Sequence, residues 1–228
     1  MKFSKQTIDV LKNYATINPS ITFKAGHKLN TLSNQMNILA STIIEEDIPQ
    51  DFSIYDDLPK LLGILSMVPD PGVEITNTHM IIRNAKNDKE MVTINFTNPE
   101  NINDAYKTIG GDSLGLVSTL ELRSEDLTRL LKSASILQVP DFVIYGDGVR
   151  VYITVTDSNN LSSNNFCLDV GETQTKFRYI FKIENIVKLM NLNYVVSLYD
   201  KKFAKFVCSE FNDGRSIEYW IACEYKSE

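Results

Sequence analysis

Hydrophobic positions along the chain follow two spacings in turn. From Ser4 to Ile17 apolar residues recur every three or four positions, which predicts an amphipathic helix with Ser4 as a plausible N-cap. The apolar positions are Ile8, Leu11 and Ala15, with Val10, Tyr14 and Ile17 alongside. Beyond this segment the period falls to two: Ile21 and Phe23 alternate with polar residues, and short apolar runs continue to Ile44. This change of period predicts strands joined by hairpins.

A second helix is predicted after Asp56-Asp57, where leucines share one helical face. These leucines are Leu58, Leu61, Leu62 and Leu65. The helix should end by Pro69, because proline lacks a backbone donor and restricts the residue before it. Alternating runs typical of strands then lead to Asn98-Pro99.

The same order of elements returns after a polar, glycine-bearing stretch from Asn98 to Gly115. Ser124 is expected to cap a third helix, whose apolar face consists of Leu127, Leu130, Leu131 and Ala134. The segment from Phe142 to Thr156 predicts two strands around a turn at Gly146-Asp147-Gly148. Glu184 to Leu192 predicts a fourth helix, with Ile186, Val187 and Met190 together.

Short matches between the halves indicate an internal repeat. Val10-Leu11-Lys12 aligns with Leu130-Leu131-Lys132, and the segment 58–62 aligns with 186–190. Each match is degenerate, but both occur in the same order and inside a helix followed by strands. We therefore predict an α+β protein of two similar domains, residues 1–110 and 111–228, each with antiparallel sheets and two helices.

Each predicted helix carries cations opposite its apolar face. They are Lys5 and Lys12 on the first helix, Lys60 on the second, Arg129 and Lys132 on the third, and Lys188 on the fourth. Any amphipathic helix at a protein surface has a charged outer face, so one such stripe carries little weight. Four stripes on a common surface would give it a positive charge suited to sequence-independent phosphate contacts.

The net charge restricts where such contacts can form. The chain has 23 Lys and Arg against 29 Asp and Glu, a formal charge of −6, so it lacks the basic excess of an ordinary duplex-DNA binder. The three cysteines form no C-x-x-C pair, which argues against a disulfide framework or a zinc site and favours a reducing cytosol. No apolar run approaches a membrane span, so we expect a soluble protein without a membrane partner.

Candidate catalytic chemistry is sparse, and we predict no enzyme, metal or cofactor. His27 and His79 are the two histidines, and both are expected at the surface. The segment 110–113 lacks the spacing of a phosphate loop and is expected to be linker. Glu45-Glu46-Asp47 and Asp56-Asp57 could hold Mg²⁺ in principle, but solvated surface and helix capping explain them better.

Three segments resemble the sliding clamps of T4-type bacteriophages, the polymerase processivity factors. They are MKFSKQTIDVLKNYATIN at 1–18, IYDDLPKLLGILSMV at 54–68 and LRSEDLTRLLKSASILQV at 122–139. The resemblance implies the DNA-clamp fold, closed head to tail into a homotrimeric ring with helices lining the hole. By motif match it places Lys5, Lys12, Lys60, Arg129 and Lys132 toward duplex DNA, whereas Lys188 is placed there only by the internal repeat. One departure is Ser133-Ala134-Ser135, where a further arginine is expected.

The resemblance also implies partners: a DNA polymerase, a clamp loader and late-transcription factors, in the cytoplasm of the infected bacterial host. Partner tails should insert into a hydrophobic pocket near the junction of the halves. Candidates for this pocket are Leu32, Met36, Tyr106, Ile109, Trp220 and Ile221. Each could instead be a core residue of a strand, and Trp220 is favoured because tryptophan is enriched at interface hot spots.

Two other functions stay open at this point. A phage structural or assembly oligomer could have a β-rich fold and no DNA in its ring, and its cationic stripes would then be scattered. A small-molecule enzyme would need a deep pocket that holds carboxylates with perturbed pKa values.

Overall fold

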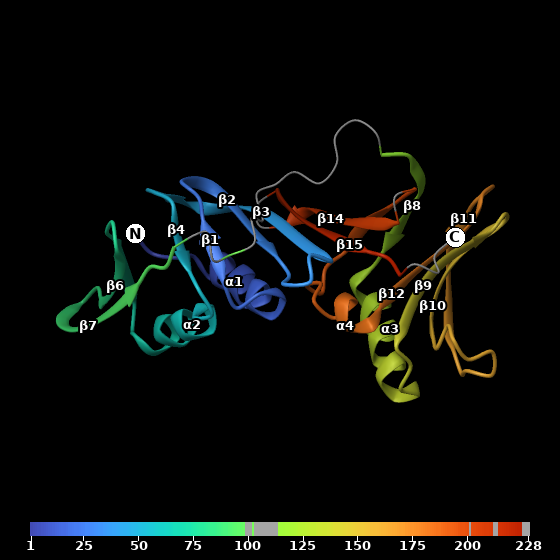
Figure 1. Ribbon diagram of the computed structural model, residues 1–228, viewed down its shortest axis with the longest axis horizontal. Helices are drawn as coiled ribbons and strands as arrows, with labels where there is room; N and C mark the ends of the chain where they lie inside the picture. The colour runs from blue at the N-terminus through green and yellow to red at the C-terminus, as the bar shows by residue number, and fades with distance from the viewer. Residues whose placement is uncertain (99–101, 103–113, 201, 212–213, 225–228) are drawn as a thin grey trace. The chain divides into compact units, whose positions relative to one another are not determined.

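The computed structural model describes residues 1–98, 102, 114–200, 202–211 and 214–224. The chain divides into two compact units, Met1–Lys107 and Thr108–Glu228. The predicted domain boundary between residues 110 and 111 lies outside the described residues and stays a prediction. The expected linker at 110–113 lies there as well. Both units combine antiparallel strands with helices, so the α+β class is confirmed (Figure 1).

The first unit contains two helices and seven strands among its described residues. These are α1 (Lys5–Ile17), β1 (Ile21–Phe23), β2 (Gly26–Leu32), β3 (Ile38–Ile48), β4 (Phe52–Ile54), α2 (Leu58–Met67), β5 (Pro71–Ile75), β6 (His79–Asn84) and β7 (Asn87–Asn95). Strand β1 pairs with β4, β2 pairs with β3, and β5, β6 and β7 form a three-stranded sheet. Helices α1 and α2 lie against each other (Figure 1).

The second unit contains eight strands and two helices in the part of it that the structure describes. These are β8 (Leu116–Leu122), α3 (Ser124–Leu137), β9 (Asp141–Asp147), β10 (Arg150–Thr156), β11 (Phe166–Glu172), β12 (Lys176–Lys182), α4 (Ile183–Ile186), β13 (Tyr194–Tyr199), β14 (Phe203–Phe211) and β15 (Arg215–Ala222). One sheet has the order β11-β10-β9-β12, and β15, β14, β13 and β8 lie in sequence in another.

Helix α1 buries a face that is rotated from the predicted one. Thr7, Val10, Leu11, Tyr14 and Ile17 are buried, whereas Ile8 and Ala15 are only half-buried. The ring of Tyr14 buries far more apolar area than the neighbouring Ala15 could, which favours burial of the face that carries Tyr14. Ser4 is the N-cap, as predicted, and its hydroxyl accepts from the Thr7 backbone N–H at 3.2 Å.

Glu46 was wrongly expected at the solvated surface. It is 9% exposed, and its carboxylate accepts from the Ser4 backbone N–H and, at 2.5 Å, from the Thr7 hydroxyl. A carboxylate is favoured at a helix N-terminus because the first N–H groups lack intrahelical partners and the helix dipole is positive there. Strand β3 therefore caps α1 from a distance.

The other three helices differ from the predictions mainly at their ends. Helix α2 ends at Met67, before Pro69 as predicted, although the carboxylate of its N-cap Asp57 makes no capping hydrogen bond. Helix α3 has Arg123 at the N-cap position instead of Ser124, whose backbone N–H donates to Asn193 Oδ1 at 2.8 Å. The predicted helix from Glu184 to Leu192 is wrong in length, since α4 stops at Ile186.

The predicted strand-turn-strand at 142–156 is confirmed. Strands β9 and β10 pair antiparallel, and Gly148 has a φ of 96° in the turn, a conformation that glycine adopts without strain. Contacts between aromatic rings contribute to the packing of each unit separately. In the first unit, Phe52 stacks on Phe23 at 4.6 Å and on Phe96 at 4.5 Å between ring centroids. In the second, Tyr194 meets Phe206 edge to face at 6.1 Å.

Candidate nucleic-acid interface

The outer faces of α1 and α2 carry the three candidate cations of the first unit. Lys5 and Lys12 on α1 and Lys60 on α2 are exposed. Because α1 and α2 contact each other, these cations belong to one helical layer of the unit. Lys12 Nζ lies 3.5 Å from Asp9 and Lys60 Nζ lies 2.5 Å from Asp57, both at a spacing of three residues.

Helix α3 presents the corresponding cations of the second unit. Arg129 and Lys132 are exposed, while Leu127, Leu130 and Ala134 on the opposite face are buried. Arg129 again has an acid three residues earlier, with Asp126 at 3.6 Å, and its guanidinium lies 5.7 Å from the centre of the Phe166 ring. Among the described residues, neither Lys5 nor Lys132 has an ion-pair partner.

Lys188 does not share this setting. It is half-buried and follows the single turn of α4, where backbone hydrogen bonds link Lys188 to Asn185 and Leu189 to Ile186. Val187, predicted on the buried face with Ile186, is 51% exposed, and Leu189 is buried instead. Lys188 thus lies outside a regular helix, and its contact with DNA stays a prediction that rests on the internal repeat.

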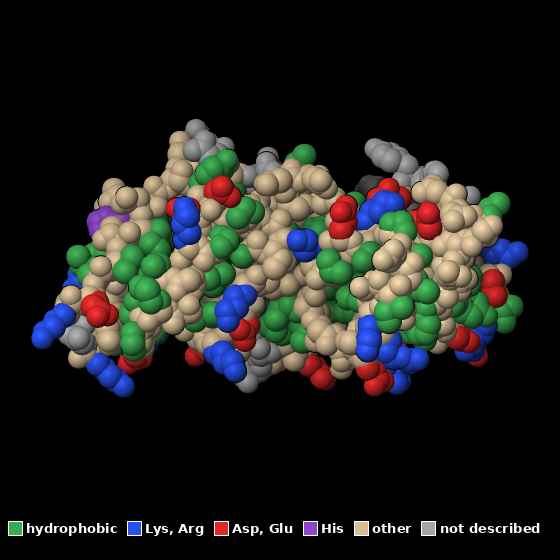
Figure 2. All heavy atoms as spheres, turned by 90° about the horizontal axis from the view of Figure 1, so that it is seen from below, with side chains coloured by type: hydrophobic (Ala, Val, Ile, Leu, Met, Phe, Trp, Pro, Cys, Tyr) green, Lys and Arg blue, Asp and Glu red, His purple; other side chains and the backbone are tan. Residues whose placement is uncertain are grey.

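Basic and acidic side chains are interspersed on the side of each unit that Figure 2 draws. Figure 2 shows Lys and Arg beside Asp and Glu in each unit, without a uniformly basic surface. Three of the candidate cations have an acidic neighbour in the chain, since Lys12, Lys60 and Arg129 pair with Asp9, Asp57 and Asp126. Such a surface can contact phosphates while holding them loosely, because each paired cation keeps an intramolecular alternative.

Trp220 lies on the half-exposed face of its strand. Along β15, Ile217, Tyr219 and Ile221 are buried, and Trp220 lies between them on the other side. Ile221 is therefore a core residue, and its placement in the partner pocket was wrong. The cause is the alternation of side chains along a strand, which puts neighbours on opposite faces.

Trp220 belongs to an aromatic cluster that sequence reasoning missed. Its ring lies 5.9 Å from Tyr199 and 5.4 Å from Phe203, and the Lys205 ammonium is 4.8 Å from the indole centre. Tyr199 and Phe203 stack on each other at 5.1 Å across the turn between β13 and β14. The signal was an aromatic residue at the end of one predicted strand and another at the start of the next, which the strand register places opposite each other.

The remaining pocket candidates are not all described. Leu32 is half-buried at the end of β2, and Met36 is 69% exposed with a φ of 56° in the turn that follows. Tyr106 and Ile109 lie outside the described residues. The predicted pocket as a whole therefore stays a prediction.

Potential catalytic groups are dispersed in the described part of the chain. His27 is exposed, and His79 is half-buried with its ring nitrogen 3.0 Å from the Thr78 hydroxyl. No cluster of three His, Cys, Asp or Glu side chains that could hold a metal occurs among the described residues. Nor does any described helix have the length and apolar character needed to cross a membrane.

Comparisons with known proteins identify the family. A model described as DNA polymerase processivity factor matches residues 3–115, and one described as gp45 sliding clamp, C terminal, matches residues 119–225. The sliding clamp of Escherichia phage RB69 is 30% identical over 245 residues, covering 100% of this chain and 98% of that protein. The chain belongs to the T4-type phage sliding clamps. The clamp of Vibrio phage KVP40 is 28% identical over 229 residues, 98% of this chain and 99% of that one.

Solved clamp structures share the fold at low sequence identity. Proliferating cellular nuclear antigen from Entamoeba histolytica has a TM-score of 0.70 at 14% identity, covering 98% of this chain and 97% of that one. A. fulgidus PCNA, solved with the C-terminal region of FEN-1, has a TM-score of 0.70 at 11% identity, covering 100% and 98%. The clamp is thus a processivity factor, and the structural-oligomer alternative is not favoured. Its family is one of non-catalytic accessory proteins.

Proposed function

We propose that three copies of the clamp close head to tail into a ring around duplex DNA, with α1, α2 and α3 facing the DNA. The observation that carries this proposal is the shared arrangement of Lys5, Lys12, Lys60, Arg129 and Lys132. Each is exposed on the polar side of a helix whose apolar side is buried in its own unit. Contacts of this kind carry no sequence information, and a closed ring needs only a weak hold.

Two sheet edges support closure into a ring. Strand β7 ends the three-stranded sheet of the first unit, and β11 ends the sheet β11-β10-β9-β12 of the second. The opposite edges are partly occupied, since Val73 of β5 donates to Met1 and Glu224 donates to Ile180 of β12. Pairing of β7 with β11 of the next copy would join non-equivalent faces, and such a contact must close to avoid a filament.

The surface around Trp220 is the proposed site for partner tails. Half-exposed aromatic side chains lie beside Lys205, whose ammonium pairs with Glu218 at 2.5 Å, so the surface offers mainly apolar area, which suits an apolar tail. We propose that the polymerase, the clamp loader and late-transcription factors use this surface in turn. We further propose that the clamp acts without catalysis, in the cytoplasm of the infected bacterial host.

Retention on DNA tests the proposal directly. The clamp should stay on nicked circular DNA after loader-dependent loading, and it should slide off the same DNA once that DNA is linearised. Light scattering should give the mass of three subunits at micromolar concentration. A mass of one subunit together with equal retention on circular and linear DNA would show that the chain does not form a closed ring.

A further inference from the structure

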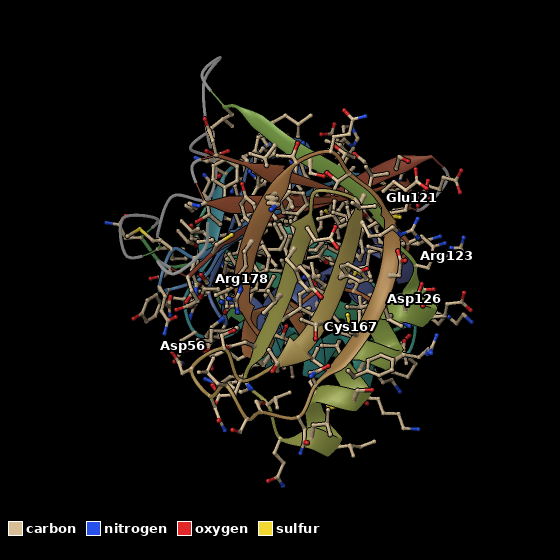
Figure 3. The ribbon with its side chains drawn as sticks, turned by 90° about the vertical axis from the view of Figure 1, so that its right-hand side faces the viewer. Asp56, Glu121, Arg123, Asp126, Cys167 and Arg178 are labelled. Atoms are coloured by element: carbon tan, nitrogen blue, oxygen red, sulfur yellow. The ribbon has the colours of Figure 1, made fainter. Side chains whose placement is uncertain are left out.

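The sheet β11-β10-β9-β12 has one face in the core and one face outside it. Phe142, Ile144, Val151, Ile153 and Phe181 are buried on the core face. Helix α3 packs on the core face of the sheet. The contact between Arg129 and the Phe166 ring shows this, since the strand register places Phe166 on the core face. The other face bears the alternate side chains of the same strands, and Figure 3 looks onto this sheet with Arg178 and Cys167 labelled.

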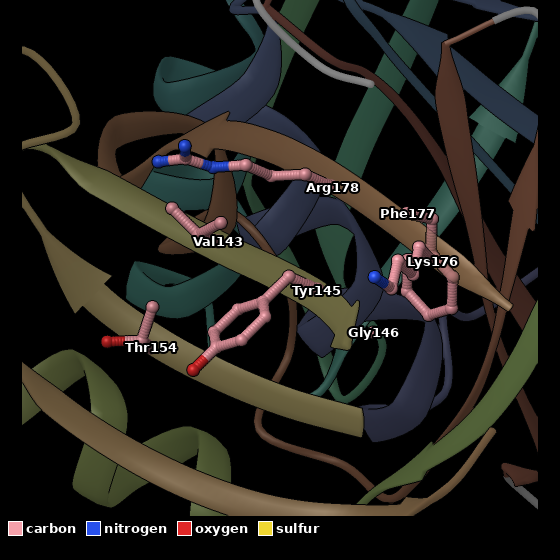
Figure 4. Close-up of a pocket in the computed structure, with 7 residues that line it drawn as sticks. All are labelled: Val143, Tyr145, Gly146, Thr154, Lys176, Phe177 and Arg178. Atoms are coloured by element: carbon pink, nitrogen blue, oxygen red, sulfur yellow. The ribbon is translucent and has the colours of Figure 1, made fainter. Parts of the chain in front are cut away.

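A groove of about 480 Å³ lies on this outer face. Its floor is formed by Val143 and Thr154, which are register partners on β9 and β10 and are 1% and 9% exposed. One side is formed by Tyr145, and the other by Lys176 and Arg178 of β12 (Figure 4). The volume falls in the range of sites that hold a few side chains of a ligand.

The tyrosine side of the groove consists of a stacked ring with a hydroxyl that can donate a hydrogen bond. Tyr145 stacks on Tyr152 with 5.1 Å between ring centroids, and its hydroxyl lies 3.9 Å from Cys167 Sγ. A tyrosine phenol is protonated at neutral pH, and burial raises the pKa of Tyr145 further, to about 12. An apolar side chain on the Val143 floor would therefore pack against an ordered ring with a hydroxyl at its edge.

The cationic side of the groove is not neutralised by an ion pair. Within the described residues, Lys176 and Arg178 have no carboxylate within ion-pair distance. Asp147, the register partner of Lys176, lies beyond ion-pair distance. Its pKa is lowered mainly by hydrogen bonds from the backbone N–H groups of Arg150 and Val149, with a smaller contribution from the Lys176 charge. By contrast, Arg150 on the same sheet is paired with Asp169 at 2.6 Å and with Glu172 at 3.2 Å.

We propose that this groove is a second docking surface, which binds an extended peptide segment of a partner protein in which acidic residues flank a bulky apolar residue. The acidic side chains bind Arg178 and Lys176, and the apolar side chain between them points to the opposite side of the extended peptide and packs against the Tyr145 ring, above Val143. Charge complementarity favours this occupant, since one side of the groove carries two cations without an ion-pair partner among the described residues, on a chain of net charge −6. A DNA strand would need a longer track of cations and free aromatic faces, and Tyr145 and Tyr152 already stack on each other.

Methyl NMR with matched peptides tests this surface. The full-length clamp, labelled at valine methyl groups, is titrated with a capped Glu-Leu-Glu-Phe peptide and with its Gln-Leu-Gln-Phe analogue. The acidic peptide should shift the Val143 methyl signals and bind at least about tenfold more tightly than the neutral one. Val143 signals that stay unchanged, or equal affinities for the two peptides, would overturn the proposal.

Substitutions separate the groove from general electrostatics. The double variant Lys176→Gln with Arg178→Gln should lower affinity for the acidic peptide about tenfold, whereas Arg178→Lys should retain most of it. Lys132→Gln is the matched control, because it removes an exposed cation without an ion-pair partner among the described residues, from α3 on the other side of the sheet. A loss in the control equal to that in the double variant would refute a specific groove. So would displacement of the peptide by an eight-residue oligothymidylate.

Discussion

The N-termini of α1 and α3 are both held by a side chain from a distant segment, but the two acceptors differ in charge and burial. Glu46 of β3 is buried and bonds both Ser4 and Thr7 at the start of α1. Asn193, which meets the start of α3, is exposed and accepts from Ser124. The same structural need is thus met strongly in the first unit and weakly in the second.

The second helices of the two units differ further. Helix α2 has ten residues and carries Pro59 in its first turn. Helix α4 has only four residues. The segment after α4 reaches Asn191 and Asn193, and both asparagine side chains bond the region around α3 instead of continuing a helix. A repeat that is visible in sequence therefore gives unequal helices, because asparagine side chains compete with the helical backbone.

The largest expected effect is on the stability that the Glu46 cap provides. Glu46→Ala leaves the Ser4 N–H and the Thr7 hydroxyl without their charged acceptor in a buried site, which should cost about 2 to 3 kcal/mol. Asn193→Ala removes one exposed neutral hydrogen bond and should cost about 1 kcal/mol or less. Denaturant unfolding of both variants measures the difference, and equal costs would remove the contrast between the two helix N-termini.

The sequence predicted elements better than it predicted their ends. Long periodic segments such as 4–17 and 142–156 fold as expected, because burying an apolar face determines the element type. The burial of Glu46 could not be predicted, since it depends on β3 meeting the start of α1, 42 residues away in the chain. The length of α4 was predicted wrongly because the helix was inferred from three apolar positions, Ile186, Val187 and Met190, without regard to the asparagines that follow them.

The candidate cations were predictable for a similar reason, and the aromatic cluster was not. Helical periodicity alone puts Lys5, Lys12 and Lys60 outside once the apolar face is buried. Trp220 was found from composition, whereas Tyr199 and Phe203 needed the register of three strands. Pairing between strands far apart in sequence is the information that a single sequence carries least clearly.

The next largest effect concerns the aromatic cluster of the second unit. Trp220→Ala should weaken binding of the polymerase's carboxy-terminal tail by about 2 kcal/mol, roughly thirtyfold, because a half-exposed indole offers a large contact area. Titration calorimetry with a tail peptide measures this loss. Ile221→Val is the control: it trims the adjacent core residue and should leave the affinity unchanged. If Trp220→Ala lowers the melting temperature strongly yet binds normally, the pocket lies elsewhere.

A smaller effect should distinguish Lys60 on α2 from Lys188 after α4 in the salt dependence of DNA binding. Lys60→Ala removes an exposed cation, so the slope of log affinity for a short duplex against log salt should fall by about 0.9 for each phosphate that is no longer neutralised. Lys188→Ala should leave the slope unchanged, because Lys188 is half-buried and already interacts within the chain. Fluorescence anisotropy between about 50 and 200 mM salt measures both slopes. The reverse order of effects would show that the short α4 segment contacts the DNA.

The smallest effect should be a gain of DNA binding when the paired acids are neutralised. Asp9, Asp57 and Asp126 each lie three residues before a cation, at 3.5, 2.5 and 3.6 Å. In each pair the carboxylate competes with phosphate for the same cation, so substitution by asparagine should raise duplex affinity by a few tenths of a kcal/mol for each site. Asparagine is also a favoured N-cap residue, so position 57 should tolerate it.

Asp9→Asn is the cleanest of the three substitutions, since Asp9 lies inside α1 away from the helix start, where a lost charge would weaken the helix itself. Glu172→Gln on β11 is the control for net charge, because it neutralises an acid of a strand ion pair and leaves Asp169 with Arg150. Retention on circular DNA at rising salt should increase for Asp9→Asn and not for Glu172→Gln. An equal increase in both variants would mean that net charge alone determines retention on DNA, and that the helix faces make no specific contribution.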